Sequence, residues 1–148
     1  MIKNIILEPS SSSFHFFIYT DEKNVTRAMS KALYYEEICT NGAYLEKNLI
    51  VIGTKSDFLK VLISFELLEN EPIVSDGTVY VNTVYSDIRI INGYIKLFDP
   101  PDGEFAKLKV PNGMFNLKVC FKEDDKVKED FSFDSYLIQM WPKFNEKS

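Results

Sequence analysis

The sequence predicts a mainly β protein, an antiparallel β-sandwich of about eight to nine strands with one short helix near the N-terminus. Aromatic residues make up 14% of the 148 residues, and aromatic and β-branched side chains favour strands. Short apolar segments recur along the chain, separated by Pro, Asn-Gly and Asp-Gly turns. Because this length suits one hydrophobic core, we expect a single domain over residues 1–148, with loose termini at 1–13 and 143–148.

The first elements are a strand and the single helix. The segment FHFFIYT predicts a strand over Phe14–Thr20, with largely covered side chains on both faces. The segment 25–38 then carries apolar residues every four positions and is rich in alanine, which predicts a short helix. Asn24 is its expected N-cap, and Asn41-Gly42 is its expected end.

Strand patterns continue from there almost to the C-terminus. In order, they cover 43–46, 49–53, 58–69, 78–91, 94–98, 105–110, 115–121 and 134–141. The dipeptide Asn92-Gly93 favours a type I′ turn, so we expect the strands on either side of it to form a hairpin. Asp99-Pro-Pro-Asp-Gly103 and Pro111-Asn-Gly113 predict further turns.

Net charge and cysteine usage limit the classes of function. The formal charge is −5, the sequence pI is about 4.9, and the chain has only two arginines, Arg27 and Arg89. This composition opposes direct nucleic-acid binding, which needs clustered Lys and Arg, and would attract a basic partner. Cys39 and Cys120 are widely spaced, and no apolar run approaches ~18 residues. We therefore expect a cytoplasmic protein with no membrane segment.

Residues suited to catalysis or cofactor binding are few. His15 is the sole histidine and is expected to be a packed strand residue, and Cys120 an inert core thiol. An enzyme that pairs His15 with Cys39 or Cys120 remains an alternative. One histidine and two distant cysteines give no zinc-site spacing, and the chain has no glycine-rich phosphate loop, so we predict no metal, no cofactor and no catalytic residues.

Carboxylate side chains are abundant, with 22 Asp and Glu residues in the chain, and many of them lie in two segments. The larger lies before the last predicted strand and the smaller lies near the Pro-Pro turn. Both can be solvated hairpin loops, a negative surface that meets a basic partner, or the loops of a calcium- or lipid-binding sandwich module. The residues concerned are Glu123, Asp124, Asp125, Glu129 and Asp130 in the first segment, and Asp99, Asp102 and Glu104 in the second.

The ordered set of these segments resembles the competence protein J family from about Phe14 to Trp141. The resemblance rests on the aromatic strand FHFFIYT, the helical YYEEICTNGAY, the paired strands LIVIGT and FLKVLISFELLE, the hairpin IRIINGYIKLF, and the closing LKVPNGMFNLKVCFKE and DSYLIQMWP. The family's founding function is inhibition of a DNA-entry nuclease, and it is similar to many small bacterial immunity proteins.

This resemblance implies a non-enzymatic inhibitor or immunity protein whose partner is a basic bacterial nuclease or toxin domain. A nuclease attracts phosphate with basic residues, so an inhibitor can present carboxylates in place of the phosphates. Aromatic side chains would supply the desolvated centre of such an interface, and Tyr34, Tyr35 and Trp141 are the candidates, with core or edge packing as their other explanation. A homodimer is also compatible with the sequence.

Overall fold

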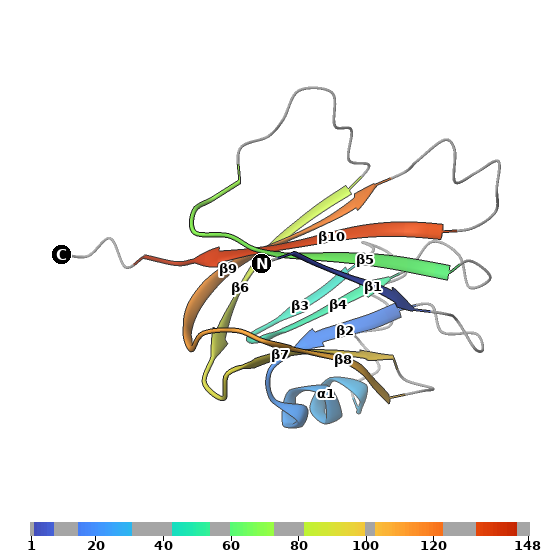
Figure 1. Ribbon diagram of the computed structural model, residues 1–148. Helices are drawn as coiled ribbons and strands as arrows, with labels where there is room; N and C mark the ends of the chain where they lie inside the picture. Colours follow the sequence, from blue (N-terminus) through green and yellow to red (C-terminus); the bar gives the residue numbers. More distant parts are fainter. Residues whose placement is uncertain are drawn as a thin grey trace.

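A computed structural model describes residues 2–7, 15–30, 43–53, 60–72, 82–99, 103–122 and 133–144. Over these ranges the chain forms ten strands and one helix, arranged as two five-stranded sheets with the helix α1 outside one of them (Figure 1). The predicted sandwich with one N-terminal helix is therefore confirmed.

The first sheet, sheet A, joins strands that are far apart in the sequence. Its order is β1 (Ile2–Leu7), β5 (Lys60–Leu67), β10 (Phe133–Pro142), β9 (Gly113–Lys122) and β6 (Asn82–Ile90). Neighbouring strands are antiparallel except β5 and β10, which run parallel in the middle of the sheet with Tyr136 opposite Ile63. The sandwich is thus antiparallel apart from this one pairing.

The second sheet, sheet B, is antiparallel throughout. Its order is β3 (Ala43–Glu46), β4 (Leu49–Gly53), β2 (His15–Tyr19), β7 (Tyr94–Asp99) and β8 (Gly103–Lys109). The register of β7 against β8 shifts between Leu97 and Phe98, as an extra residue in one strand requires.

Two hydrophobic clusters hold these layers together. Between the sheets, alternate residues of strands from both sheets form the main core, in which Phe16 and Tyr136 meet edge to face at 5.4 Å between ring centroids. The remaining residues of β2 point the other way, so Phe17 and Tyr19 belong to a second cluster on the outer face of sheet B. Both faces of β2 are therefore covered, as its aromatic sequence predicts.

The helix α1 (Glu22–Met29) covers that outer cluster with Val25 and Ala28. Its N-cap is Asp21, whose side chain accepts a hydrogen bond from the Lys23 backbone N–H at 3.0 Å. The predicted N-cap, Asn24, is wrong, because the helix begins before it. The rest of the predicted helix, including Asn41-Gly42, lies outside the described residues.

Three further expectations differ from the structure. The N-terminus expected to be loose contains β1, which pairs with β5 from Ile2 to Leu7. The segments LIVIGT and FLKVLISFELLE are not paired, because β4 belongs to sheet B and β5 to sheet A. The strands around Asn92-Gly93 form no hairpin either: β6 lies in sheet A and β7 in sheet B, so this turn carries the chain between the sheets.

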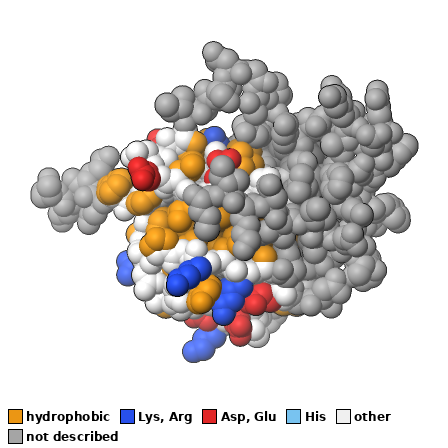
Figure 2. All heavy atoms as spheres, in the orientation of Figure 1, with side chains coloured by type: hydrophobic (Ala, Val, Ile, Leu, Met, Phe, Trp, Pro, Cys, Tyr) orange, Lys and Arg blue, Asp and Glu red, His pale blue; other side chains and the backbone are white. Residues whose placement is uncertain are grey.

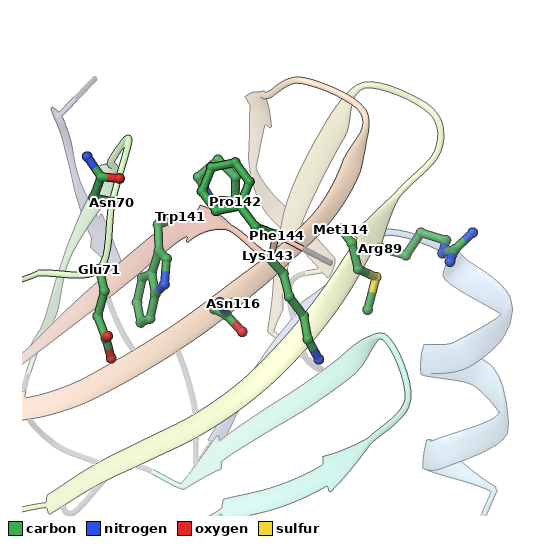
Figure 3. Close-up of a pocket in the computed structure, with 9 residues that line it drawn as sticks. All are labelled: Asn70, Glu71, Arg89, Met114, Asn116, Trp141, Pro142, Lys143 and Phe144. Carbon is green, nitrogen blue, oxygen red and sulfur yellow. The ribbon is translucent and has the colours of Figure 1, made fainter. Parts of the chain in front are cut away.

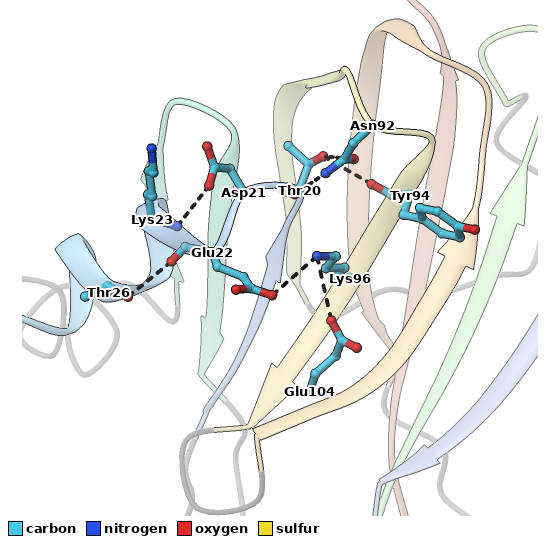
Figure 4. A network of polar contacts seen from close by, with 9 residues as sticks. All are labelled: Thr20, Asp21, Glu22, Lys23, Thr26, Asn92, Tyr94, Lys96 and Glu104. Carbon is cyan, nitrogen blue, oxygen red and sulfur yellow. Dashed lines mark hydrogen bonds and ion pairs between the residues drawn. The ribbon is translucent and has the colours of Figure 1, made fainter.

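The crossover turn is fixed by side chains instead of by a strand ladder. The Asn92 Nδ2 donates to the Thr20 carbonyl at 3.2 Å, and the Thr20 hydroxyl lies 3.1 Å from both the Asn92 Oδ1 and the Tyr94 carbonyl (Figure 4). The turn at Asn112 carries the chain back from β8 in sheet B to β9 in sheet A. A hydrogen bond joins the two turns, because the Gly93 N–H donates to the Asn112 Oδ1 at 2.7 Å. Gly93 has φ +80°, a conformation that glycine adopts without steric cost.

Candidate functional site

The two acidic segments leave the sandwich at the same end, which we call the acidic end. In sheet B, Gly53 pairs with His15, and Phe98 pairs with Phe17, so Gly53 lies near the β7–β8 connection. In sheet A, Tyr136 lies opposite Phe121 and its hydroxyl approaches the Gly53 carbonyl at 3.4 Å. The strand ends that flank 100–102 and 123–132 therefore lie at the same end of the sandwich, on the right of Figure 1.

Most of the predicted binding residues are not among those that the structure describes. Those outside the described residues are Tyr34, Tyr35, Asp102, Glu123, Asp124, Asp125, Glu129 and Asp130. Asp99 ends β7 with its backbone opposite Gly103, and its side chain is outside the description. Glu104 is the one acidic candidate whose side chain is described.

Glu104 takes part in a charge cluster that ties the sheet to the helix (Figure 4). The Lys96 ammonium lies 4.0 Å from the Glu104 carboxylate and 3.5 Å from that of Glu22 at the start of α1. The pKa of the neighbouring Tyr19 is raised to about 12, chiefly by burial and then by the charges of Glu104 and Glu22 and a hydrogen bond to Glu104. The Glu104 carboxylate therefore already interacts with Lys96 and Tyr19 of its own chain.

The thiol alternative finds no support at Cys120. The side chain is fully buried on β9, within 4.0 Å of the Thr83 hydroxyl. Burial raises the pKa of the Cys120 thiol, so the thiol stays protonated near neutral pH. The nucleophilic form of cysteine is the thiolate, which is therefore scarce at this position. The predicted inert thiol is confirmed as buried, although it projects from the face of sheet A opposite to Val119 in the core. Cys39 and the His15 side chain lie outside the described residues.

Within the described ranges, no three His, Cys, Asp or Glu side chains gather in an arrangement that could hold a metal ion. The one helix found there, α1, is too short and too polar to cross a membrane.

A groove that was not predicted from the sequence lies at the opposite end of sheet A, and we call it the end groove. Its larger hollow has a volume of about 740 Å³ (Figure 3). Residues from the ends of four neighbouring strands line it: Asn70, Glu71, Arg89, Met114, Asn116, Trp141, Pro142, Lys143 and Phe144. A second hollow of about 490 Å³ adjoins it and shares Met114 and Pro142.

The C-terminal residues that were expected to be loose help to build this groove. The Lys143 N–H donates to the Met114 carbonyl at 2.8 Å, and the Lys143 ammonium pairs with Asp87 at 2.9 Å. These bonds hold the chain in place beyond Pro142, the last residue of β10. Phe144 follows them and is 70% exposed on the surface. Trp141 is only 6% exposed, so it packs against the sheet and shows an edge to the groove. The aromatic pair Trp141 and Phe144 was the signal in the sequence.

Large hydrophobic residues are also exposed on these strands. Tyr85 on β6, Ile91 directly after β6 and Phe144 after β10 are 59%, 66% and 70% exposed. Figure 2 shows hydrophobic side chains gathered over the region of β6 and β9, with charged side chains grouped below them near α1.

Neither a protein-family model nor a curated protein matches the sequence. The solved structures give two matches to the whole fold. The first is the crystal structure of ComJ, inhibitor of the DNA degrading activity of NucA, from Bacillus subtilis, with a TM-score of 0.66 at 17% identity over 97% of this chain and 99% of ComJ. The fold is that of ComJ. The second, described as crocagin biosynthetic gene J, has a TM-score of 0.62 at 13% identity over 97% of this chain and 98% of that protein.

The resemblance to the competence protein J family is therefore confirmed at the level of the fold. The ComJ fold also occurs in a protein named for biosynthesis. A shared fold does not carry one function with it, because function depends on the site.

Proposed function

We propose that this protein binds and inhibits a bacterial nuclease or a related toxin, and that it is not an enzyme. The observation that carries the proposal is the ComJ fold, shared over nearly the whole of both chains with a protein that inhibits the DNA degrading activity of NucA. The proposed partner presents a basic, DNA-binding surface, and the proposed complex is stoichiometric and cytoplasmic.

Electrostatics supports the acidic end as the contact surface. The net charge of −5 would steer a basic protein toward the inhibitor, and the strands that flank the two acidic segments end on one side of the sandwich. Carboxylates there would occupy the position that DNA phosphates take on the enzyme. Close charge pairs across nuclease–inhibitor interfaces are coupled by about 1.5–7 kcal/mol, which is enough to compete with a polyanion. Tyr34 and Tyr35 remain the proposed aromatic contacts.

The direct test is a titration of DNA degradation. Purified NucA, and separately a nuclease encoded beside this gene, would be mixed with increasing amounts of the protein, and cleavage of a fluorescent duplex would be followed. We expect activity to fall linearly and to reach its minimum near one inhibitor per enzyme. Undiminished cleavage by both nucleases at a tenfold excess of inhibitor would contradict the proposal.

The contact surface has its own test, which uses two variants of equal charge. One variant neutralises the acidic end (Glu123→Gln, Asp124→Asn, Asp125→Asn), and the control neutralises three exposed acids elsewhere (Glu22→Gln, Glu69→Gln, Glu71→Gln). We expect the first to slow association more than the control at low ionic strength. The difference should vanish near 1 M salt, where the Debye length falls to about 3 Å. Equal rates for both variants would remove Glu123, Asp124 and Asp125 from the contact surface.

A further inference from the structure

The two hollows at the end of sheet A form one continuous groove, because Met114 and Pro142 line both of them. The groove crosses the sheet from the residues that follow β5, over the ends of β10 and β9, to Arg89 on β6. Three strand spacings of about 4.8 Å give it a length of about 15 Å. An extended chain advances about 3.3 Å per residue, so the groove accommodates roughly four or five residues.

Between its two ends, the lining of the end groove combines apolar and aromatic side chains with the polar side chain of Asn116. Trp141 and Met114 line its centre, and Phe144 stands 70% exposed beside them. On the side of the second hollow, Leu68 and Pro111 continue the apolar lining. Aromatic residues and methionine are enriched at the cores of protein interfaces, and the groove offers them on a rigid sheet.

The two ends of the end groove carry opposite charges. Glu71 lies at the β5 end and Arg89 at the β6 end, and the apolar side chains lie between them together with Asn116 and Lys143 (Figure 3). Neither charged group forms an ion pair with any residue that the structure describes, whereas the nearby Lys143 is paired with Asp87 at 2.9 Å. Two unpaired, opposite charges about 15 Å apart therefore complement a ligand that has a cation at one end and a carboxylate at the other.

We propose that the end groove binds a short extended peptide segment of a partner protein, with a basic residue at Glu71, apolar side chains over Trp141 and Met114, and an acidic residue at Arg89. The groove lies at the opposite end of the sandwich from the strand ends that flank the acidic segments. A partner bound in the groove would therefore leave the acidic end free for the nuclease proposed above.

Trp141 is the only tryptophan in the chain, so its fluorescence and its indole N–H signal in NMR report on the end groove alone. The probes are four blocked peptides without aromatic residues: Lys-Leu-Val-Leu-Glu and versions with Lys, Glu or Gln at both ends. We expect Lys-Leu-Val-Leu-Glu to bind about three- to tenfold more tightly than the other three, given the modest strength of exposed ion pairs. An unresponsive Trp141, or equal affinities for all four peptides, would overturn the proposal.

Charge inversion tests the two ends separately. Arg89→Glu should shift the preference to the peptide with Lys at both ends, and Glu71→Lys to the peptide with Glu at both ends. The control is Lys107→Glu, which makes the same charge change as Arg89→Glu on β8 of sheet B, where Lys107 covers the Tyr94 ring. If Lys107→Glu alters the order of the peptides as Arg89→Glu does, the preference reflects net charge and the proposed orientation is wrong.

Discussion

Tyr19 is only 2% exposed, yet its hydroxyl lies among carboxylates that repel its ionised form. Its pKa is raised to about 12, by burial first and then by Glu104 and Glu22. An unfolded tyrosine ionises near pH 10. Between these values the folded chain keeps a proton that the unfolded chain releases, so the free energy of unfolding falls as the pH rises from about 10 to 12.

The variant Tyr19→Phe cannot ionise and so lacks this dependence. We expect the native protein to lose stability relative to Tyr19→Phe when the pH is raised from 9 to 11.5. Urea unfolding of both proteins at the two pH values measures the difference, in which the titration of the other groups cancels. A constant difference would show that Tyr19 ionises as readily in the folded protein as in the unfolded chain.

Individual side chains were predicted well where burial alone decides their state and poorly where a distant partner does. Burial of Cys120 was expected because free cysteine is among the most buried residue types, although strand alternation puts Cys120 on the face of sheet A away from Val119 and the core. The ion pair of Glu104 could not be predicted from the sequence, because its partner Lys96 faces it only after β7 and β8 have paired. The end groove has the same origin: Glu71, Arg89 and Trp141 are far apart in the sequence.

At the scale of single elements, α1 depends on its first turn. The eight-residue helix is too short to be stable alone in water, so its cap and its contacts with sheet B stabilise it. Asp21 satisfies the N–H of Lys23, whereas the Asn24 side chain accepts an exposed hydrogen bond from Arg27.

Replacement of the two candidate caps separates their roles. Asp21→Ala should lower the free energy of unfolding by about 0.5–2 kcal/mol, as is typical for loss of an N-cap. Asn24→Ala, the matched control, should change it by less than about 0.5 kcal/mol. Chemical denaturation of both variants gives the comparison, and a larger effect for Asn24→Ala would place the helix start where the sequence first suggested it.

The crossover turn at Gly93 also depends on one backbone conformation. A Cβ atom at this position would meet no atom closer than the Val110 carbonyl oxygen at 4.0 Å, so space does not exclude a side chain. The φ of +80° disfavours a side chain, because this backbone conformation costs a residue with a Cβ atom about 1–2 kcal/mol. Gly93→Ala should therefore destabilise the protein by about that amount, and Gly93→Asn by less, since asparagine tolerates this region. Equal thermal midpoints for the two variants would argue against backbone strain.

The Asn-Gly prediction failed at the level of pairing. The sequence predicts a type I′ turn at Asn92-Gly93. The chain bends there, but of these two residues only Gly93 has a positive φ, so the predicted turn type is wrong as well. A two-residue turn between alternating strands usually joins neighbours in one sheet. Here the Asn92 and Thr20 hydrogen bonds hold the turn across the gap between sheets, and local sequence does not contain that information. Strand positions were thus predictable from periodicity, but strand partners were not.

For the whole molecule, the exposed edges of the sheets need protection from pairing with other chains. In sheet B, the edge strand β8 carries Lys107 and Lys109 at exposed positions. In sheet A, the edge strand β6 has its Arg89 N–H occupied by the Asn48 side chain at 2.9 Å. Lysines and a capped N–H both disfavour strand addition, so the described parts of these edges favour partners that bind surfaces and loops.

The other edge of sheet A is β1, and its pairing with β5 makes the N-terminus part of the sandwich. All six of its residues lie opposite β5, so removal of residues 1–7 deletes a whole ladder and turns β5 into an edge strand. At a net value of about 0.5–1.5 kcal/mol per hydrogen bond, and after the ordering entropy of the segment is subtracted, we expect the free energy of unfolding to fall by at least about 2 kcal/mol.

Hydrogen exchange distinguishes this local effect from general damage. In the truncated protein, amides of β5 that face β1 should lose protection, whereas amides of β9, two strands away, should keep it until global unfolding. Removal of residues 145–148 is the matched truncation, because it takes away none of the described sheet hydrogen bonds. If the two truncations lower stability equally, β1 contributes no more than a free terminus, and the stable sheet begins at β5.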